Sequence, residues 1–298
     1  MKKFLALLLA TLFVLSFAAC GGDTAKDPTD VSADASADAS DAVSDAASGA
    51  DASDVAATND DNTRVVGFDA EFPPFGFIAD DGSYDGFDLA MAQEVCTRLG
   101  WTFVAQPIDW NSKDAELASG NIDCIWNGFT KTGREADYTW TDAYYDNSIV
   151  MVVKADSGIA TLADLAGKNV ATQAASSAED ALLAEDRAEL KASFSELISL
   201  ADYNSAFLEL GQGTADAIAA DIGVAKYNMA NKEGEYIILD EAVSSEQYGI
   251  GFKLGNDALA AQIWAQVEAI AADGTMATLA EKYVEKGLVV DSLVLLNK

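Results

Sequence analysis

The chain has 298 residues, with 49 acidic and 18 basic side chains, no histidine and a formal net charge of −31. Such acidity disfavours nucleic acid and anionic membrane surfaces as partners. The lack of histidine removes Ser-His-Asp and Cys-His catalysis in their usual forms and most transition-metal sites. The sequence also has no phosphate loop and no GxGxxG after a strand, so we expect neither a metal nor a cofactor.

Residues 1–19 have the pattern of a secretory signal peptide. Lys2 and Lys3 precede a run of about sixteen uncharged residues, which is short for a membrane span of ~20. Cys20 follows "SFAA" and precedes two glycines, and this stretch resembles a lipoprotein box, in which the cysteine is lipidated. An ordinary signal peptide with an incidental Cys20 is the alternative. The pattern predicts an extracytoplasmic protein held on the outer face of the membrane by a lipid.

Residues 20–62 form a separate segment of different composition. Residues 23–62 consist mainly of Asp, Ala, Ser and Thr, with eleven Asp and one Lys. They contain almost no large apolar side chain and cannot offset the entropy of ordering. We expect a self-repelling, extended tether that lets a folded domain stand away from the membrane.

The remaining residues, 63–298, alternate between strand-like and helix-like runs. The expected strands are "RVVGFD", "TFVAQPID", "IDCIWNGFT", "IVMVVK", "NVATQ", "ELISL", "DAIAAD", "YIILD" and "YGIGFKL". The expected helices include "GFDLAMAQEVCTRLG", "TLADLAGKNV", "SSAEDALLAEDRAEL" and two near 257–272 and 275–286. This alternation predicts an α/β fold with parallel sheets covered by helices.

Four polar side chains lie at the ends of predicted strands. They are Asp69, Asn127, Gln173 and Asp221. Ligands of open α/β sheets bind in the crevice beyond the carboxyl ends of the strands, so these residues are candidates for one site. The first strand also continues into "AEFPPFGF", which is too apolar for a surface loop and too acidic for a core strand. The wall of a ligand pocket would explain both properties.

Three further motifs carry a possible recognition chemistry and also have a plain structural interpretation. Ser176 and Glu179 fit the capping box that starts a helix, whose free N–H groups suit a carboxylate. Thr130 offers a hydroxyl, and Arg134 offers a planar fork that can bind a carboxylate in two places, although it could equally be a surface arginine. Asp221 could pair with an ammonium or could cap the helix "IGVAKY".

Aromatic residues and cysteines are less specific. Phe72 and Trp110 lie at strand ends, where core packing is the usual role. Cys96 and Cys124 have apolar neighbours and are interpreted as buried thiols, with a disulfide open as the alternative in an extracellular setting. "DDGSYDG" is interpreted as a tight Asp-Gly turn, because it lacks the bidentate Glu of a calcium loop.

The order of these motifs along the chain resembles one family. "GFDAEFPPFGFIADDGSYDGFDLAMAQEVCTRLG", "NGFTKTGREADYTWTDAYY", "TLADLAGKNVATQAASSAEDAL" and "LGQGTADAIAADIGVAKY" resemble, in this order, the bacterial extracellular solute-binding proteins of family 3. These are the polar amino acid receptors of ABC importers. The resemblance covers nearly all of 63–290. It implies a periplasmic-binding-protein-like type II fold, with residues 63–150 and 250–298 in lobe 1, 151–249 in lobe 2 and a two-segment hinge.

The resemblance also implies roles for individual residues. Phe72 and Trp110 flank the ligand side chain, Asp69 and Gln173 contact it, and Asp221 receives the α-ammonium. Gly128 and Thr130 hold the backbone of the ligand, and Arg134 pairs with its α-carboxylate, although "TKTGRE" is one residue shorter than the usual pattern. The complete set of implied contacts is Asp69, Phe72, Trp110, Asn127, Gly128, Phe129, Thr130, Arg134, Gln173, Ser176, Ser177 and Asp221.

The family implies ligand-induced lobe closure, read by a membrane permease, in a protein that is not an enzyme and is expected to be a monomer. Two alternatives stay open at this stage. One is an enzyme on the same fold, of the cyclohexadienyl dehydratase kind, with Glu71 as the candidate general acid. The other is a sensing module for a separate membrane kinase. The sequence does not specify which amino acid is bound.

Overall fold

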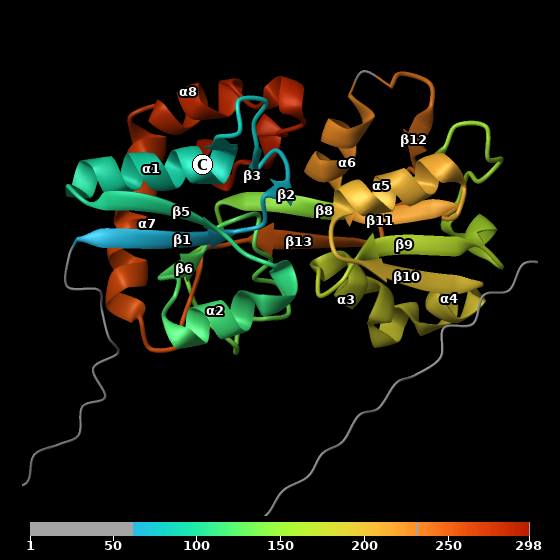
Figure 1. Ribbon diagram of the computed structural model, residues 1–298, viewed down its shortest axis with the longest axis horizontal. Helices are drawn as coiled ribbons and strands as arrows, with labels where there is room; N and C mark the ends of the chain where they lie inside the picture. The colour runs from blue at the N-terminus through green and yellow to red at the C-terminus, as the bar shows by residue number, and fades with distance from the viewer. Residues whose placement is uncertain (1–61, 231, 298) are drawn as a thin grey trace, which may run out of the picture. The chain divides into compact units, whose positions relative to one another are not determined.

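A computed structural model of the chain describes residues 62–230 and 232–297 (Figure 1). The predictions of a signal peptide, a lipidated Cys20 and an extended tether concern residues 1–61 almost entirely and lie outside this part. Among the described residues, no helix is both long enough and apolar enough to cross a membrane.

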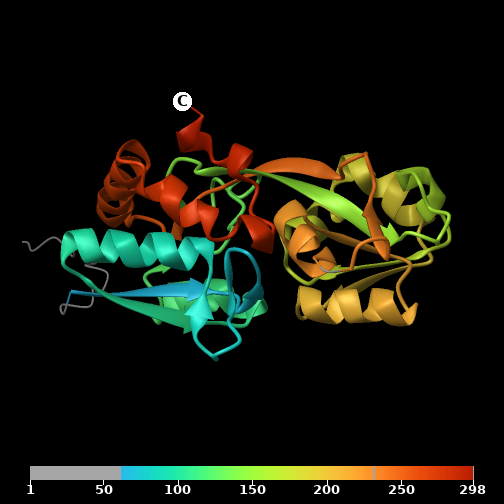
Figure 2. The same ribbon diagram turned by 90° about the horizontal axis from the view of Figure 1, so that it is seen from above.

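The first sheet has five strands in the order β5, β1, β6, β14, β7. Their bounds are β1 Thr63–Phe68, β5 Thr102–Pro107, β6 Cys124–Ile125, β7 Thr139–Trp140 and β14 Gly251–Phe252. The helices packed with it are α1 Phe87–Leu99, α2 Lys113–Ser119, α7 Asp257–Ala272 and α8 Thr275–Glu281. Helices α7 and α8 lie beside α1, as Figure 2 shows from above. We call this group of elements the first lobe.

The second sheet has six strands, with β10, β9, β11, β8 and β12 in a row and β13 also paired with β8. Their bounds are β8 Tyr145–Lys154, β9 Asn169–Gln173, β10 Glu196–Leu200, β11 Ala217–Asp221, β12 Tyr236–Ile238 and β13 Ser244–Tyr248. Helices α5 Tyr203–Gln212 and α6 Ile222–Met229 cover one face, and α3 Ser177–Leu183 and α4 Ala188–Ser193 cover the other (Figure 1). We call this group the second lobe.

Both sheets are mixed, whereas the sequence predicted parallel sheets. Strand β8 runs antiparallel to β11, β12 and β13, and β14 runs antiparallel to β6 and β7. The reason lies in the connections: the chain enters the second lobe along β8 and leaves it along β13, so these two segments must run in opposite directions. They form the two-segment hinge, and the two-lobed α/β architecture agrees with the predicted fold class.

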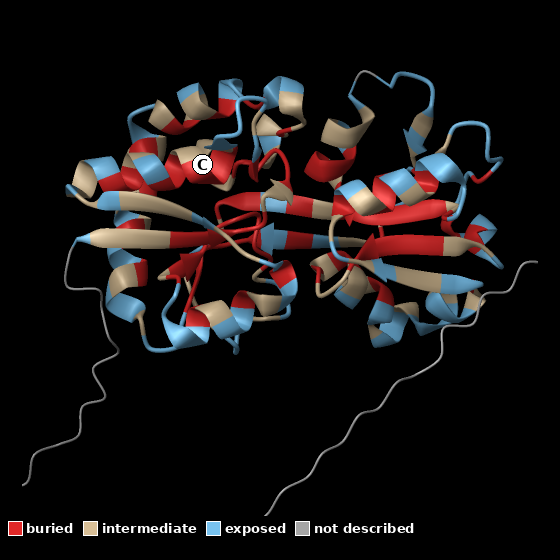
Figure 3. Ribbon diagram, in the orientation of Figure 1, coloured by how far each residue is buried: buried red, intermediate tan, exposed pale blue. Residues whose placement is uncertain are grey.

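The burial of the second sheet follows the two-residue period of a strand. In β8, Ile149, Met151 and Val153 face the core under α3, while Val150 and Val152 face the core under α5 and α6. Figure 3 shows β9 and β11 buried along nearly their whole length and the edge strand β10 more exposed. A strand with helices on both faces must be apolar on both, which explains the run of small apolar residues in "AIAAD".

Several predicted elements differ in detail. The helix expected over "SSAEDALLAEDRAEL" is broken at Ala184, whose extended backbone separates α3 from a 3₁₀ turn at Glu185–Arg187 and from α4. Within the strand expected over "YGIGFKL", only Tyr248, the last residue of β13, and β14 at Gly251–Phe252 are strand, and the rest of β13 precedes the expected strand. The short helix expected near 162 is a 3₁₀ turn, Leu162–Leu165, and the last predicted helix stops at Glu281 before a 3₁₀ turn at Val284–Lys286.

Some elements were not predicted from the sequence. Among them are helix α2, the 3₁₀ turn Trp110–Ser112 before it, strand β7, and a small antiparallel sheet of β2 Glu71–Phe72, β3 Gly76–Ile78 and β4 Tyr84–Asp85. Two further 3₁₀ turns, Val290–Ser292 and Val294–Leu296, lie near the end of the chain. The small sheet contains the apolar "EFPPFGF" stretch and folds it against α1 and α5.

Candidate functional site

Residues at the ends of β1, β6 and β9 form a buried polar cluster that joins the lobes. The Asp69 backbone N–H donates to Asn127 Oδ1 at 2.9 Å, and Gln173 Nε2 of the second lobe donates to Asp69 Oδ2 at 2.6 Å. All three side chains are buried. Burial raises the pKa of Asp69, and the negative charges of Asp202 and Asp109 raise it further, although the hydrogen bond from Gln173 opposes the shift. The structure therefore brings these three predicted residues together.

Asp221, the last residue of β11, is a second buried carboxylate. Asn147 Nδ2 donates to Asp221 Oδ1 at 2.7 Å, the Tyr248 hydroxyl donates a short hydrogen bond to the same oxygen, and the Tyr203 hydroxyl lies 3.4 Å from Oδ2. Asp221 makes no side-chain cap to helix α6, which was the alternative interpretation of this residue. Burial, and then the charge of Glu246, raise its pKa to about 7.

Glu246 is a third buried carboxylate, which the sequence analysis did not identify. It lies on hinge strand β13 opposite Asn147 of β8. Its Oε1 accepts hydrogen bonds from Thr130 Oγ1 at 2.7 Å, Asn147 Nδ2 at 2.9 Å and Ser177 Oγ at 3.0 Å. Burial raises its pKa, and the three hydrogen bonds and the charge of Arg134 oppose that shift. One carboxylate oxygen thus joins the first lobe, the hinge and the second lobe.

The segment after β6 approaches the site closely through its backbone. Gly128 has a φ of 54°, and a Cβ at this position would lie 2.7 Å from Cε1 of Phe72, so a side chain here would be strained and would clash. Its N–H donates to Oδ2 of the fully buried Asp88 at 2.6 Å. Phe129 differs from its neighbours, because its ring lies in the core against Trp110.

Arg134 reaches the second lobe, but its partner is a side chain of the protein. Its Nη2 donates to Asp180 Oδ2 at 2.5 Å, and its guanidinium lies 5.5 Å from the centre of the Phe129 ring. Asp180 is on the first turns of α3 and is largely exposed. Lys113, a buried cation from the first lobe, makes a similar crossing: its Nζ lies 3.3 Å from the carbonyl oxygen of Ala175.

The start of α3 has the helix cap that the sequence predicted. Ser176 Oγ accepts from the Glu179 N–H at 3.1 Å, and Glu179 Oε2 accepts from the Ala175 N–H at 2.7 Å. The Ser177 hydroxyl takes no part in this cap and donates to Glu246 instead. Ala175 has a φ of 54°, an uncommon conformation for a residue with a Cβ.

The two predicted aromatic walls are both nearly buried and lie in different clusters. Phe72 packs against Phe75 and Tyr203, with ring centres 5.9 and 6.0 Å away. Trp110 packs edge-on against Phe129 at 5.6 Å, and Lys113 Nζ lies 5.1 Å from the Trp110 ring centre. Phe72 is thus close to Gly128, whereas Trp110 is close to Lys113 and the crossing to the second lobe.

Sequence reasoning missed Glu246, Asn147, Tyr203, Tyr248 and Lys113. A weak signal was present in "SSEQYGIGF", where a glutamate stands on a strand that otherwise enters the core. Glu71, the candidate general acid, is half-buried beside Asp202, and burial together with that neighbour raises its pKa to about 7.

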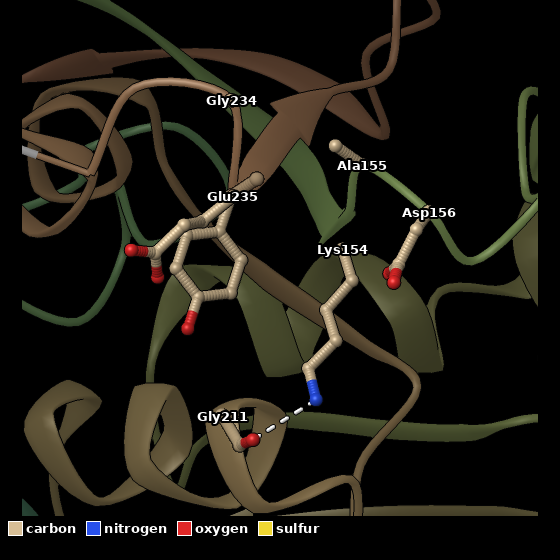
Figure 4. A pocket seen from close by; sticks show the side chains of 7 residues that line it. Lys154, Ala155, Asp156, Gly211, Gly234 and Glu235 are labelled. Atoms are coloured by element: carbon tan, nitrogen blue, oxygen red, sulfur yellow. Dashed lines mark hydrogen bonds between the residues drawn. The ribbon is translucent and has the colours of Figure 1, made fainter.

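A separate hollow of about 540 Å³ lies on the second lobe, with lining residues Lys154, Ala155, Asp156, Gly211, Gly234, Glu235 and Tyr236 (Figure 4). Two of these lining residues contact each other: Lys154 Nζ donates to the carbonyl oxygen of Gly211 at 2.9 Å. Lys154 is seven residues along β8 from Asn147, about 23 Å at the rise of a strand. This hollow therefore lies far from the carboxylates described above and contains none of the predicted residues.

The cysteines and the other acidic groups offer no metal site in the described residues 62–230 and 232–297, where no cluster of three or more ligating side chains occurs. Cys96 and Cys124 are buried, unpaired thiols. Burial raises the pKa of Cys96 to about 11 and that of Cys124 well above its ordinary value, as expected for structural thiols.

Two lobes, a two-strand hinge and buried charged side chains between the lobes are typical of a solute receptor. Residues 65–286 match the bacterial extracellular solute-binding proteins, family 3, and the chain belongs to this family. It is therefore an extracytoplasmic solute-binding protein.

Three relatives illustrate the range within the family. The L-cystine-binding protein TcyJ of Escherichia coli (strain K12) is 28% identical over 225 residues, which cover 74% of this chain and 82% of TcyJ. An ABC uptake transporter substrate-binding protein from Streptococcus pneumoniae, solved with bound histidine, is 30% identical, with a TM-score of 0.73 over 77% of this chain and 95% of its own. An ancestral arginine-binding protein bound to arginine is 34% identical, with a TM-score of 0.68 over 74% and 98%.

These relatives are binding proteins, in agreement with the prediction that the chain is not an enzyme. The raised pKa of Glu71 is consequently explained by burial and by its neighbour Asp202, without a catalytic role. The relatives bind different amino acids, so the residues of this chain must decide the ligand.

Proposed function

We propose that the crevice between the lobes binds an L-amino acid with a cationic side chain and presents it to the permease of an ABC importer. The observation that carries this proposal is the arrangement of three buried carboxylates, Asp69, Asp221 and Glu246, from the first lobe, the second lobe and the hinge. Buried carboxylates need positive partners, because an unpaired buried charge costs several kcal/mol.

The backbone of the amino acid supplies one positive and one negative group. Asp221 is the acceptor for the α-ammonium, and its position beside Asn147 and Tyr248 fixes the orientation of its oxygens. The α-carboxylate is received by the Thr130 hydroxyl of the first lobe, the Ser177 hydroxyl of the second lobe and the guanidinium of Arg134. Gly128, with no side chain to obstruct it, lets its backbone come close to the ligand.

The side chain of the ligand is directed toward Asp69. Gln173 contacts this carboxylate from the opposite lobe, and Phe72 and Trp110 supply apolar walls. The charges of Asp202 and Asp109 add to the negative potential there. A guanidinium or ammonium group on the ligand would neutralise Asp69, whereas an uncharged side chain would leave this carboxylate buried and unpaired. This difference supports arginine, lysine or another cationic amino acid over the neutral ones.

Closure follows from the placement of these groups on two bodies. We assign residues 63–150 and 250–298 to lobe 1 and 151–249 to lobe 2, with the hinge in β8 and β13. Asp69, Thr130 and Arg134 belong to lobe 1, and Gln173, Ser177 and Asp221 belong to lobe 2. A ligand can contact both sets only when the lobes meet, so binding favours the closed arrangement that a permease can read.

A thermal-shift screen of the twenty amino acids plus L-citrulline tests the ligand class. A ligand at about 1,000 times its Kd adds ~4 kcal/mol to the free energy of unfolding, which raises the Tm of a domain of this size by about 8–16 °C. We expect L-arginine or L-lysine to give the largest shift. L-citrulline, which has nearly the shape of arginine without its charge, should give a much smaller one. A larger shift from L-citrulline or L-glutamine contradicts the cationic class.

We further propose that Cys20 carries a lipid anchor and that the Asp-rich segment before Thr63 serves as a tether without a role in affinity. The lipoprotein-like "SFAAC" stretch supports the first statement, and the composition of residues 23–62 supports the second. Cys20→Ala should release the protein from membranes with unchanged amino acid binding. A protein that begins at Thr63 should bind as the mature chain does. Sedimentation of the variant with membranes, or a tenfold loss of affinity on truncation, contradicts the respective statement.

A further inference from the structure

Glu246 is one of the three buried carboxylates at the site, but the proposed function assigns it no contact with the ligand. Glu246 is 7% exposed and points from hinge strand β13 toward the junction of the lobes, next to Asn147 of β8. Its three hydrogen-bond donors come from three different parts of the fold, namely Thr130 of the first lobe, Asn147 of the hinge and Ser177 of the second lobe. All three donate to the same oxygen, Oε1.

Two of these donors are the hydroxyls that the proposed function assigns to the α-carboxylate of the ligand. A serine or threonine hydroxyl has a single O–H and donates to one acceptor at a time. Thr130 and Ser177 therefore cannot serve Glu246 and a ligand carboxylate together. Hydrogen bonds to an ionised acceptor are roughly twice as strong as neutral ones, so Glu246 is a strong competitor for them.

Like charge adds to this competition. The ligand carboxylate would lie within hydrogen-bond reach of groups that are themselves 2.7 and 3.0 Å from Glu246 Oε1. The positive charge of Arg134 acts on Glu246 as well, so this guanidinium is shared between the two anions. Its direct ion pair goes to Asp180, which leaves Glu246 without a cation in hydrogen-bond contact among the described residues.

We propose that Glu246 is a specificity-determining residue: it acts as an internal carboxylate that competes with the α-carboxylate of the ligand and sets how strongly the site prefers free amino acids over carboxyl-blocked ones. The proposal rests on the proposed function, since it requires an amino acid in this site. It predicts that wild-type protein tolerates α-amides better than the donors alone would allow.

A different role for Glu246 is distinguishable. Asn147 Nδ2 lies between Asp221 Oδ1 at 2.7 Å and Glu246 Oε1 at 2.9 Å, so Glu246 also adds negative potential near the place of the α-ammonium. If this were its main effect, removal of its charge would weaken a free amino acid and its α-amide equally, because both carry the ammonium. The ratio of the two affinities therefore isolates the effect on the carboxylate.

The experiment is a calorimetric titration of wild type, Glu246→Gln and Glu246→Ala with L-arginine and L-argininamide. Glu196→Gln, an exposed position on edge strand β10, is the control for loss of one negative charge elsewhere. In Glu246→Gln, the ratio Kd(L-argininamide)/Kd(L-arginine) should rise about tenfold over wild type, equivalent to ~1.4 kcal/mol. Glu246→Ala, which removes the acceptor altogether, should show at least as large a rise, and Glu196→Gln should show none.

Each result has a definite meaning. An unchanged ratio in both Glu246 variants overturns the competition, even if absolute affinities change. A failure of both variants to fold, seen by circular dichroism, assigns Glu246 to the structure of the hinge and also overturns it. If wild type binds L-arginine in no measurable way, the proposed ligand class fails, and this assignment fails with it. A raised ratio in correctly folded variants supports the proposal, because a purely structural residue would change both affinities alike, and a lowered ratio overturns it.

Discussion

Binding of L-arginine should release protons below neutral pH, and Asp221 should be their main source. Its carboxyl has a pKa raised to about 7 by burial and by the charge of Glu246. The other groups that face it are Tyr248 on β13, Asn147 on β8 and Tyr203 on α5. In the proposed complex the α-ammonium needs an ionised Asp221, so the ligand binds the deprotonated form and lowers this pKa.

The direction and the size of the pH effect on affinity follow from the linkage between ligand binding and deprotonation of Asp221. Above about pH 7 the carboxylate is already ionised, and affinity is at its full value. Below that, each pH unit costs about tenfold in affinity, until the pKa of the complex is reached. At about pH 5.5 the loss is ~30-fold, or ~2 kcal/mol. At about pH 6 roughly nine-tenths of a proton should leave Asp221 for each L-arginine bound. Asp69, whose pKa is also raised, should likewise release protons when L-arginine binds, whereas Glu246, beside the ligand carboxylate, should take protons up.

Calorimetry at about pH 6 in two buffers of different ionisation enthalpy measures the number of protons released. Asp221→Asn keeps the shape of the side chain and cannot ionise, so it should bind L-arginine at least tenfold more weakly at about pH 8. It should also lack most of the proton release at about pH 6. Wild type without proton release, or a variant with the same release, would refute the role of Asp221 as the ammonium acceptor.

Three further predictions concern neighbouring groups. Asp69→Asn should reduce the preference for L-arginine over L-citrulline by about ten- to a hundredfold in competitive titrations, and an unchanged preference would exclude Asp69 from the site of the ligand side chain. Asp180→Asn removes an exposed ion pair worth at most ~1 kcal/mol and should strengthen L-arginine binding up to about fivefold, because it frees Arg134. Arg134→Ala should instead weaken L-arginine binding about tenfold or more. If both variants changed the affinity equally, Arg134 would not be the group that binds the ligand carboxylate. Burial raises the pKa of Asp88 to about 7 in the folded chain, so this carboxyl stays protonated well above the pKa that it has in the unfolded chain. Its contribution to the free energy of unfolding is therefore full below about pH 4 and is lost as the pH rises through 7. In Asp88→Asn the free energy of unfolding should not show this loss, which is on the order of 4 kcal/mol. If the pH profiles of urea unfolding were parallel for wild type and Asp88→Asn, Asp88 would not titrate as described.

The parts of the fold that the sequence predicted correctly depend on local patterns. Helix α1 has its apolar residues on one face and a left-handed Gly100 at its end. Strands β9 and β11 end in a polar residue and β1 is followed directly by one, and the topology of an α/β sheet places such strand ends together. This is why Asp69, Gln173 and Asp221 could be proposed from the sequence.

The parts that it missed depend on pairing over long distances. Asn147 and Glu246 are 99 residues apart, and their contact exists only because β13 returns along β8 in one register. The ion pair of Arg134 with Asp180 spans 46 residues and two lobes. The break of the predicted helix at Ala184 has no Gly or Pro to mark it in the sequence, and helices α3 and α4 on either side of the break pack against each other.

Calorimetric titration of the wild-type protein with L-arginine and with L-citrulline at about pH 8 decides whether this chain is a receptor for a cationic amino acid. We expect saturable binding of one L-arginine per chain and at least tenfold weaker binding of L-citrulline, because only the charged side chain neutralises the buried Asp69. Equal affinity for the two ligands, or saturable binding of L-citrulline alone, would contradict it.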